Sequence, residues 1–462
     1  MYEIVRLDLL TNLSASIPIW HTLDAWVDFS LPLKIPLQGF IQDVKKVITE
    51  YVFHTKLEEI NMSKLSLSQL PIKGKKVLVR VDFNVPLDRE QKITDDTRIR
   101  ASLPTIQYIL DSGGAVILMS HLGRPKGKSS AEFSLKPCAT RLSELLNHPV
   151  IMAPDCIGNE THQLAANLQP GQILLLENLR FHLGEEHPEK EPSFTQQLAS
   201  LGDVYVNDAF GTAHRAHAST AEITRYFPGK AAAGFLLEKE VKYLNSSLVQ
   251  PTRPFYAIIG GAKISTKIGV LESLLQKADA ILIGGGMAYT FLKAQGLAIG
   301  DSIHEDEFLD KAKQLLALSQ SGRAKIILPQ DLVIADSLSK DAVVQIIPTE
   351  QGIPSSFQGV DIGPQTIQNF TTILQDAATI FWNGPLGVFE IEPFSKGTYA
   401  IAHVLAESSA TTIVGGGDSI AALQSAGLAE KITHLSTGGG ASLEYIEFGT
   451  LPGIEALSDA TS

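Results

Sequence analysis

Residues 76–83 read KVLVRVDF, and a second apolar run, AVILMSH, follows at residues 115–121 after the helix-length amphipathic segment 98–111. Short β-branched runs that alternate with helix-length segments predict right-handed βαβ units and a parallel sheet. The alternation continues through an amphipathic segment at residues 139–146 and the runs VIMAP (150–154), ILLLE (173–177) and DVYVN (203–207). The first half of the chain is therefore predicted to be an α/β domain built on a parallel sheet.

The pattern is interrupted by a long helical stretch and then starts again. LLEKEVKYLNSSL (236–248) has helical periodicity and is followed by Pro251 and Pro254, so we interpret it as a bridge between two domains. Beyond it, helix-length segments such as 267–276 and 305–318 separate the strand-like runs FYAIIGG (255–261), AILIGGG (280–286), KIILPQD (325–331), TIFWNG (379–384), TTIVGGG (411–417) and HLST (434–437). This alternation predicts a second domain, and the fold class is two Rossmann-like, doubly wound parallel-sheet domains.

Composition limits the classes of protein that fit. The chain has 462 residues, of which 44% are hydrophobic, which is enough for two substantial cores. Its formal net charge of -12 disfavours nucleic-acid binding, so its arginines are better explained by a local pocket than by a basic surface. Cys138 and Cys156 form no CxxC pair, and both are expected to be buried free thiols in a reducing compartment. No apolar run approaches the roughly 18 residues that span a bilayer.

Residues 1–61 do not continue the alternation. Their scattered acidic residues argue against a transit peptide, and they lack the cationic start of a secretory signal. Two interpretations stay open. Residues 27–53 have strand-like and then helix-like periodicity, which fits an appended structural element. Alternatively, Met62 is the true start, and the codons for Glu58 and Glu59 belong to a ribosome-binding sequence.

The strand-end loops of the two halves differ in chemistry. The first half ends its strands with RVDFN (80–84), SHLGR (120–124), ENLRF (177–181) and NDAFGTAHR (207–215). The second half has GGAK (260–263), GGGM (284–287), GGGDS (415–419) and GGGAS (438–442) at these places. Ligands bind outside the carboxyl ends of parallel strands. Guanidinium and imidazole groups suit a compact polyanion, whereas exposed backbone N–H groups suit the phosphates of a nucleotide. The loops thus predict two different anions.

Each of these features also has a purely structural explanation. A single arginine is often part of a surface ion pair, a single histidine is often packed, an aspartate after glycines often caps a helix, and a glycine triplet is often a tight turn. A two-lobed solute-binding protein would also bind anions between α/β domains, although no signal peptide is visible. A dehydrogenase is disfavoured because GxGxxG is absent, and the absence of GxxxxGK[ST] argues against a P-loop enzyme.

Eight motifs in this order resemble those of the phosphoglycerate kinase family: RVDFNVP, SHLGRP, LENLRF, NDAFGTAHR, GGAK, WNGPLGVFE, GGGDS and STGGGAS. The resemblance covers the chain from Met62 to its end, and HLGEEHPEKEPSF (182–194) is similar to the bacterial form. It implies a magnesium-dependent, reversible phosphoryl transfer between 1,3-bisphosphoglycerate and ADP, giving 3-phosphoglycerate and ATP in glycolysis and gluconeogenesis. It also implies a cytoplasmic, monomeric enzyme whose last segment, with LPGIEAL, returns to the first domain. An inactive relative is a third rival, but every family residue that we place is present.

The resemblance divides the chain into an extension (1–61), a 3-phosphoglycerate-binding domain (62–235), a bridging helix (236–250), a nucleotide-binding domain (251–440) and a return segment (441–462). It implies substrate binding by Asp82, Phe83, Asn84, Arg98, His121, Leu122, Gly123, Arg124, Arg180, His214 and Arg215. It implies nucleotide binding by Lys267, Gly284, Gly285, Gly286, Glu390, Gly416, Gly417, Asp418, Ser419, Gly438, Gly439 and Gly440, with Asp418 holding Mg²⁺ and Glu390 accepting from the ribose.

Phosphoryl transfer depends mainly on alignment and on stabilisation of charge. The attacking oxygen of an ionised phosphate or carboxylate needs no general base. The catalytic residues that the resemblance implies are therefore cations: Arg98, Lys263 and Lys267. We expect Lys263 to lie in a glycine-rich turn and Lys267 one helical turn later on the same face, with both held by one helix N-terminus. Glu240 and residues 436–437 are the predicted hinge positions.

Overall fold

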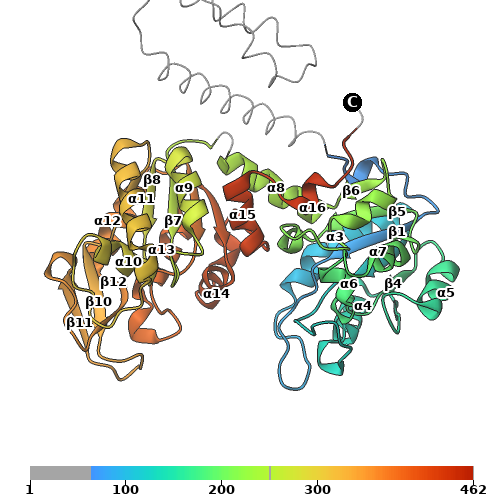
Figure 1. The fold of residues 1–462 in the computed structure, drawn as a ribbon, viewed down its shortest axis with the longest axis horizontal. Coiled ribbons are helices and arrows are strands. Elements are labelled where there is room, and N and C mark those ends of the chain that lie inside the picture. Colours follow the sequence, from blue (N-terminus) through green and yellow to red (C-terminus); the bar gives the residue numbers. More distant parts are fainter. Residues whose placement is uncertain (1–63, 249–250, 461–462) are drawn as a thin grey trace, which may run out of the picture. The chain divides into compact units, whose positions relative to one another are not determined.

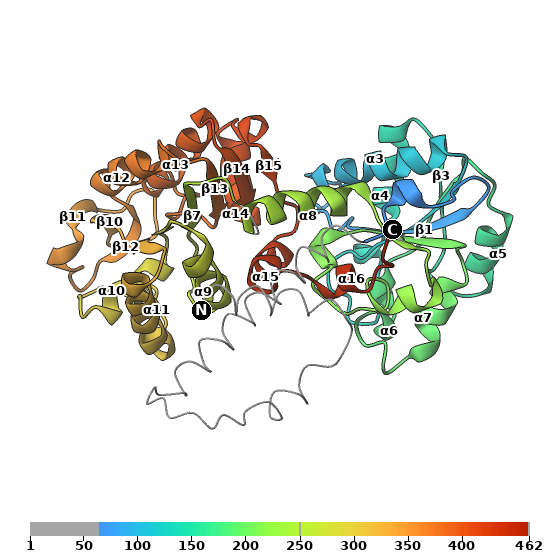
Figure 2. The ribbon, with the colours of Figure 1, turned by 90° about the horizontal axis from the view of Figure 1, so that it is seen from above.

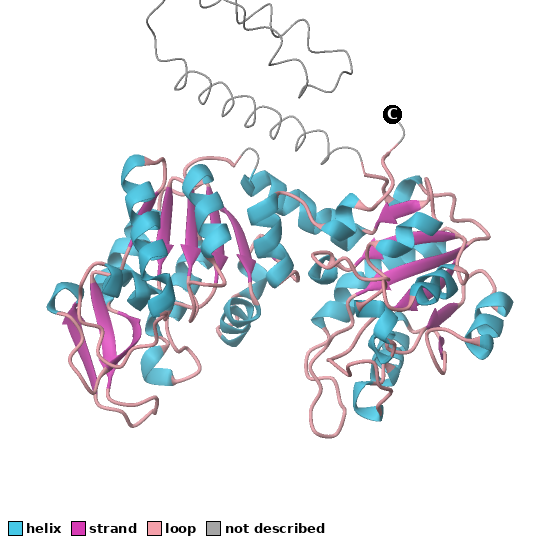
Figure 3. Ribbon diagram, in the orientation of Figure 1, coloured by secondary structure: helices cyan, strands magenta, loops and turns pink. Residues whose placement is uncertain are grey.

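The computed structural model describes residues 64–248 and 251–460, so the predictions for residues 1–61 lie outside the described part of the chain. Within it, residues 67 to 460 form two α/β domains, each built on a six-stranded parallel sheet. Figure 3 shows the strands of each sheet side by side, with helices packed against them. The predicted fold class is confirmed. No helix in the described residues is long and apolar enough to cross a membrane.

The first sheet has the strand order β3-β4-β2-β1-β5-β6, with β1 and β2 in the middle of the sheet. Its strands are β1 (Lys76–Val81), β2 (Ala115–Met119), β3 (Val150–Met152), β4 (Ile173–Leu175), β5 (Val204–Asp208) and β6 (Ala231–Ala233). The helices are α3 (Thr97–Asp111), α4 (Lys136–Leu146), α5 (Asn159–Asn167), α6 (Leu183–Glu186) and α7 (Pro192–Ala199).

Alternate residues of β1 face different cores. Val77 and Val79 pack with Ile106 of α3, whereas Leu78 packs in the cluster that includes Phe194 of α7. Figure 2 shows α3 and α7 on opposite sides of this sheet. Because both faces of the strand are covered, β1 is a continuous apolar run rather than an alternating one.

The second sheet has the order β15-β14-β13-β7-β8-β9. Its strands are β7 (Phe255–Ile259), β8 (Ala280–Ile283), β9 (Lys325–Ile327), β13 (Thr379–Asn383), β14 (Thr411–Gly415) and β15 (His434–Leu435). Helices α9 (Ile268–Lys277), α10 (Met287–Ala294) and α11 (Leu309–Ser321) contribute to one core, and α12 (Pro364–Leu374), α13 (Lys396–Glu407) and α14 (Gly417–Ser425) to the other. Figure 2 shows α9 and α11 on one side and α12 and α13 on the other.

A small antiparallel sheet was not predicted from the sequence. β10 (Asp331–Ala335) pairs with β11 (Val344–Pro348) and with β12 (Gln358–Ile362). The run KIILPQD had been assigned to one strand, but β9 ends at Ile327 and β10 begins at Asp331, two strands of different sheets. Figure 1 shows this sheet at the periphery of its domain, in orange. Four of the five residues of β11 are exposed, so the strand has no buried face that would give it a recognisable period.

Helix α8 (Phe235–Leu248) covers the stretch predicted as the bridge, and α15 (Gly440–Phe448) and α16 (Pro452–Glu455) precede the end of the chain. The final segment adds to the first domain: the Leu65 N–H donates to the Ser458 carbonyl oxygen at 2.8 Å, and the Ser458 N–H donates to that of Ala231 at 2.9 Å. These two hydrogen bonds attach Ser458, near the end of the chain, to the first domain. Cys138 and Cys156 are buried and free, as predicted.

Candidate active site

The polar loops of the first domain meet in a cavity of about 320 Å³. Asp82 and Asn84 follow β1, His121 follows β2, and residues 211–215 follow β5, so the parallel register brings them to one sheet edge. Most residues predicted to bind the substrate line this cavity, together with the glycines at the start of α15; its lining is Asp82, Asn84, Arg98, His121, Gly123, Arg124, Arg180, Gly211, Thr212, His214, Arg215, Gly438, Gly439 and Gly440.

Hydrogen bonds between these loops fix the geometry of the cavity. Asn84 Oδ1 accepts from the Gly123 N–H at 2.9 Å, and Arg180 Nη1 donates to the Gly123 carbonyl at 2.9 Å. Arg98 Nη1 donates to the Asn84 carbonyl at 3.0 Å and lies 3.2 Å from Asp82 Oδ2. The arginines are therefore held by backbone groups and by the carboxylates of Asp82 and Glu186. Among the four arginines of the cavity, only Arg124 has no ion pair to any described residue.

Burial and mutual repulsion weaken the proton affinity of the cationic groups. Desolvation lowers the pKa of Arg180, and the neighbouring Arg215 and Arg80 lower it further, against the opposing effect of Glu186. Burial and the charge of Arg80 hold the pKa of His121 well below its usual value. His214 shifts in the same direction because of burial and Arg215. An anion in the cavity would reverse these electrostatic effects, so the field of the cavity favours one.

A buried network supports the cavity from behind. Arg80 is 1% exposed; its Nε donates to Ser219 Oγ at 2.9 Å, and its Nη2 lies 3.2 Å from His121 Nδ1. The Ser219 hydroxyl donates to Glu185 Oε1 at 2.7 Å. The carboxylate of Glu185 balances part of the charge of Arg80. These supporting residues were not predicted from the sequence. Arg80 belongs to RVDFN, but the alternation of strands and helices does not show toward which side of the sheet its side chain points.

Two predicted binding residues present no side chain to the cavity. Phe83 is fully buried and Leu122 is 2% exposed, both within the core cluster that contains α3 and α4. Only their backbone groups are available to a ligand. Gly211 and Thr212 line the cavity although they were not predicted. A Cβ atom on Gly211 would lie 2.8 Å from Asp82 Oδ2, so glycine is required here by the packing of the loops.

Lys263 lies in a turn, as predicted. Lys267 was predicted to be the first residue of a helix, but α9 begins at Ile268, so Lys267 immediately precedes it. Lys263 is exposed, whereas Lys267 is partly buried and its Nζ donates to Asn383 Oδ1 at the end of β13. Burial lowers the pKa of Lys267 to about 8, and Asp418 opposes this shift.

Asn383 is a second residue that the sequence analysis missed. It is 2% exposed, and its Nδ2 has no hydrogen-bond partner among the described residues. Cβ atoms on Gly415 and Gly416 would lie 3.3 and 3.2 Å from that nitrogen. The side chain therefore presents an unused donor to the glycine loop after β14, where a phosphate oxygen would satisfy it. The residue that could have been noticed in the sequence is the asparagine of the motif WNG. A buried amide nitrogen is rarely left unpaired, so a buried asparagine without an internal acceptor suggests a ligand.

The glycine loops divide into packed and open positions. Gly260 and Gly284 are packed against residues 384–386, so a side chain at either position would collide with these residues. Packing alone therefore explains why these two positions are glycine. Four glycines of these loops have no atom within 4 Å of an added Cβ: Gly261, Gly439, Gly417 at the start of α14 and Gly440 at the start of α15. Backbone N–H groups at helix starts favour anions. Gly417 and Gly440 therefore leave space for an anion beside the backbone of these helix starts.

The remaining predicted nucleotide residues differ in availability. Asp418 is exposed in the first turn of α14, while Ser419 is fully buried and its Oγ accepts from the Gly384 N–H at 2.7 Å. Glu390 is exposed in a turn after β13, and Gly285 and Gly286 pack against the GGAK turn. Apart from the triplet 438–440, the predicted nucleotide residues lie outside the 320 Å³ cavity.

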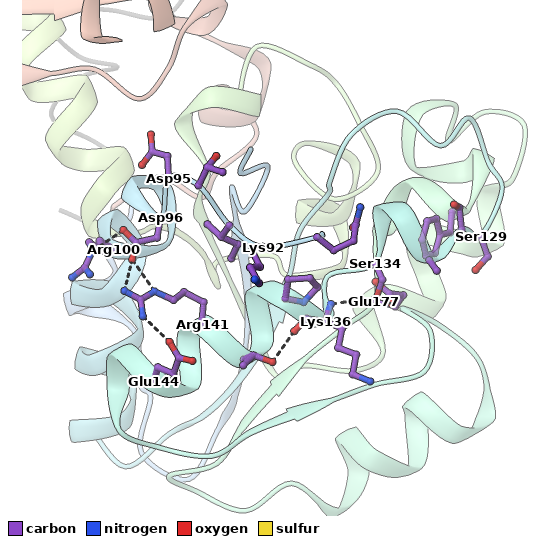
Figure 4. Close-up of a pocket in the computed structure, with 18 residues that line it drawn as sticks. Lys92, Asp95, Asp96, Arg100, Ser129, Ser134, Lys136, Arg141, Glu144 and Glu177 are labelled. Carbon is purple, nitrogen blue, oxygen red and sulfur yellow. Dashed lines mark hydrogen bonds and ion pairs between the residues drawn. The ribbon is translucent and has the colours of Figure 1, made fainter. Parts of the chain in front are cut away.

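A larger cavity of about 1150 Å³ contains none of the predicted site residues. Figure 4 shows Asp96 paired with Arg100 and Arg141, and Arg141 also paired with Glu144. Asp96 accepts from Arg100 Nε at 2.8 Å and from Arg141 Nε at 2.9 Å, and Glu177 accepts from the Ser134 hydroxyl at 2.7 Å. Its charges are largely neutralised within the protein, which distinguishes it from the cationic cavity.

The structure thus has two parallel-sheet α/β domains, one with a cationic cavity and one with glycine-rich strand ends, and both features suit anionic ligands. A family model described as phosphoglycerate kinase matches residues 67–448. The chain belongs to the phosphoglycerate kinase family.

Individual relatives agree with this assignment. Phosphoglycerate kinase of Chlorobium phaeobacteroides is 56% identical over 401 residues, covering 86% of this chain and all of the relative. The cytosolic phosphoglycerate kinase of Triticum aestivum is 54% identical, covering 86% of this chain and 98% of its own. Among solved structures, phosphoglycerate kinase from Coxiella burnetii has a TM-score of 0.75 at 44% identity, and that from Pyrococcus horikoshii OT3 has 0.74 at 33%. These two comparisons cover 85% of this chain and 98% of each solved chain.

Proposed function

We propose that this enzyme transfers a phosphoryl group reversibly between 1,3-bisphosphoglycerate and ADP, giving 3-phosphoglycerate and ATP, as a cytoplasmic monomer of glycolysis and gluconeogenesis. The observation that carries the proposal is the 320 Å³ cavity, where four arginines and two histidines meet the start of α15. A phosphoglycerate is small and carries several negative charges. Several converging donors are needed to replace its water.

Within this proposal, Arg180, Arg215 and Arg124 bind the anionic groups of the sugar acid, and Asp82 and Asn84 accept from its hydroxyl. Arg98 and Lys263 stabilise the phosphoryl group in transit. Lys263 suits this role because it is exposed in the turn before α9. The N–H groups at the start of α15 border the same cavity and favour the charge of the transferring group.

The nucleotide is assigned to the second domain. Lys267 and the unpaired Nδ2 of Asn383 suit phosphate oxygens, and the loop at 416–419 supplies backbone donors at the start of α14. Gly284 to Gly286 would border the adenine. Glu390, exposed after β13, suits the ribose hydroxyls. Asp418 fits Mg²⁺, because an exposed carboxylate beside phosphate-binding N–H groups is the usual protein ligand of this ion. Bound there, magnesium would neutralise phosphate charge.

We assign residues 62–235 to the substrate domain, 236–250 to the bridging helix, 251–440 to the nucleotide domain and 441–462 to the return segment. Transfer requires both ligands to meet, and exclusion of water protects an acyl phosphate from hydrolysis. Glu240 is the proposed hinge residue: its buried carboxylate accepts from Ser436 Oγ at 2.7 Å and from the Thr437 N–H at 2.6 Å.

The decisive experiment is a coupled assay with 3-phosphoglycerate and MgATP, comparing Arg98→Ala with Arg100→Ala. Both arginines belong to α3, but Arg100 lines the 1150 Å³ cavity and pairs with Asp96. We expect about a 10²- to 10³-fold loss for Arg98→Ala and little loss for Arg100→Ala. Equal rates in the two variants would refute the assignment of Arg98. A solute-binding protein would bind the anion without turnover.

A further inference from the structure

Three potential metal ligands converge outside the cavities described above. Asp155 and Cys156 lie in the loop between β3 and α5, and His182 lies between the 3-10 helix Leu179–Phe181 and α6. One ligand atom from each residue lies within 4.8 Å of the other two. Among residues 64–248 and 251–460 this is the one cluster of three such groups.

The chemistry of the three groups is mixed. Together they offer a thiol sulfur, an imidazole nitrogen and a carboxylate oxygen, which is a donor set that zinc accepts in tetrahedral coordination. Zinc bonds are about 2.0 to 2.3 Å long, so one sulfur, one nitrogen and one oxygen around it stand roughly 3.3 to 3.5 Å apart. From a spread of 4.8 Å the thiol would approach by about 1.3 Å at most, and the His182–Asp155 pair, now 2.7 Å apart, would open by about 0.6 Å.

Neighbouring groups already orient the ligands. His182 Nε2 is 2.7 Å from Asp155 Oδ1, and the imidazole stacks on Phe194 with ring centroids 5.3 Å apart. The Thr161 hydroxyl donates to the Asp155 carbonyl at 2.9 Å, which fixes the loop. Cys156 is fully buried, while the side chains of Asp155 and His182 are 43% and 23% exposed, so the open side of the cluster is the carboxylate and the imidazole. A metal ion would enter from that side.

We propose that Asp155, Cys156 and His182 bind one divalent cation of the zinc class, with water as the fourth ligand. Three metal bonds form, to sulfur, nitrogen and oxygen. The hydrogen bond between His182 Nε2 and Asp155 is broken, the Cys156 thiol releases its proton to solvent, and His182 releases one where it is charged. Binding therefore strengthens as pH rises.

Occupancy of the site connects two segments of the first domain. His182 is two residues after Arg180, which lines the cationic cavity, and Asp155 belongs to the separate loop after β3. A metal that joins them stabilises the folded domain by mass action and restrains the segment that carries Arg180.

The test uses the metal-depleted full chain, without nucleotide and with a phosphine in place of a thiol reductant. Co²⁺ is titrated first, because its bond to a thiolate gives a charge-transfer absorption, and Zn²⁺ is then added to displace it. The chain has two cysteines, so Cys138→Ser is a matched control for Cys156→Ser. Cys138 is also fully buried, with a pKa raised to about 12 by burial, but it does not belong to the cluster.

We expect one equivalent of Co²⁺ to give the thiolate absorption, and Zn²⁺ to abolish it. The absorption should disappear in Cys156→Ser and in His182→Gln and persist in Cys138→Ser. The His182 variant keeps both thiols and decides the question if the Cys156 variant does not fold. No absorption in the parent protein, or an absorption that persists in His182→Gln, overturns the proposal.

Discussion

Replacing Lys267 with methionine should lower activity and change the pH dependence of stability in a defined direction. Burial lowers the pKa of this lysine from 10.5 to about 8. Each pH unit between the two values corresponds to about 1.4 kcal/mol, so the buried charge costs the folded protein up to roughly 3 kcal/mol below pH 8. Methionine removes this cost, but it also leaves Asn383 Oδ1 without its hydrogen-bond donor. The lost hydrogen bond costs about 1 to 3 kcal/mol and so offsets most of the gain in stability.

The pH dependence separates these two effects. Between pH 8 and 10.5 the unfolded lysine keeps its proton while folded Lys267 has lost it. The unfolded state therefore binds more protons, and the contribution of Lys267 to stability rises with pH. The hydrogen-bond loss in Lys267→Met does not titrate. Relative to the parent protein, the variant should thus lose up to roughly 3 kcal/mol between pH 7 and pH 10.5.

Urea titrations at several pH values measure this difference, and Lys263→Met is the matched control. Lys263 belongs to the same turn but is exposed, so its removal should leave the difference from the parent nearly constant with pH. Both variants should lose about 10²- to 10³-fold in rate. Parallel pH profiles of stability for the parent and Lys267→Met would refute the conclusion that burial depresses the pKa of this lysine.

Three further substitutions test other parts of the structure. Gly440→Ala adds a methyl group where no atom lies within 4 Å, at the start of α15; we expect an unchanged or slightly higher melting temperature and slower phosphoryl transfer, and an unaltered rate would contradict a transferring group at this backbone. Glu240→Ala leaves the buried donors of His434, Ser436 and Thr437 without their acceptor, so we expect a loss of about 3 kcal/mol in urea titrations; a loss below 1 kcal/mol would show that water replaces the carboxylate. In the Asp155–His182 pair the pKa of the carboxyl is lowered and that of the imidazole is raised, so the pair stabilises the fold between these pKa values. Its contribution is lost as pH rises through the raised pKa of His182 or falls through the lowered pKa of Asp155; stability of His182→Gln measured against the parent should reproduce both losses, and a constant difference would contradict them.

The sequence predicts the strands of both sheets except β6, the short run Ala231–Ala233, because the central strands are covered on two faces. Continuous apolar runs such as those of β1 and β2 arise from burial on both sides, and the residues that follow them are brought to one edge by parallel register. The same reasoning fails for β11, which is exposed and packs against one strand of a small antiparallel sheet. The pattern of apolar and polar residues in β11 is therefore the same as that of a loop, and it does not predict a strand.

The site residues were predictable by type but not by partner. Motif positions place Arg180 and His121 at strand ends or turns, whereas Arg98 belongs to no motif and lies in the first turn of α3. The contact of Glu186 with Arg180 Nε, at 3.3 Å, depends on the path of the chain after the 3-10 helix and was not predicted. The segment 267–276 was predicted as helical from Lys267, but α9 begins one residue later, at Ile268. A glycine-rich turn and a first helical turn have similar compositions, so only the geometry distinguishes them.

In both domains, burial lowers the pKa of cationic residues that are proposed to bind or to support the ligands. Lys267 in the second domain and Arg180 and His121 in the first have their pKa values lowered, and burial is the leading reason in each case. Burying a cation before a ligand binds makes the folded protein less stable. The same burial strengthens the attraction of the cation for an anion, because the local dielectric constant is lower. An anion bound at Lys267 raises its pKa again, so binding near pH 8 should take up a proton at this residue. Selection for activity and selection for stability therefore act in opposite directions at these positions.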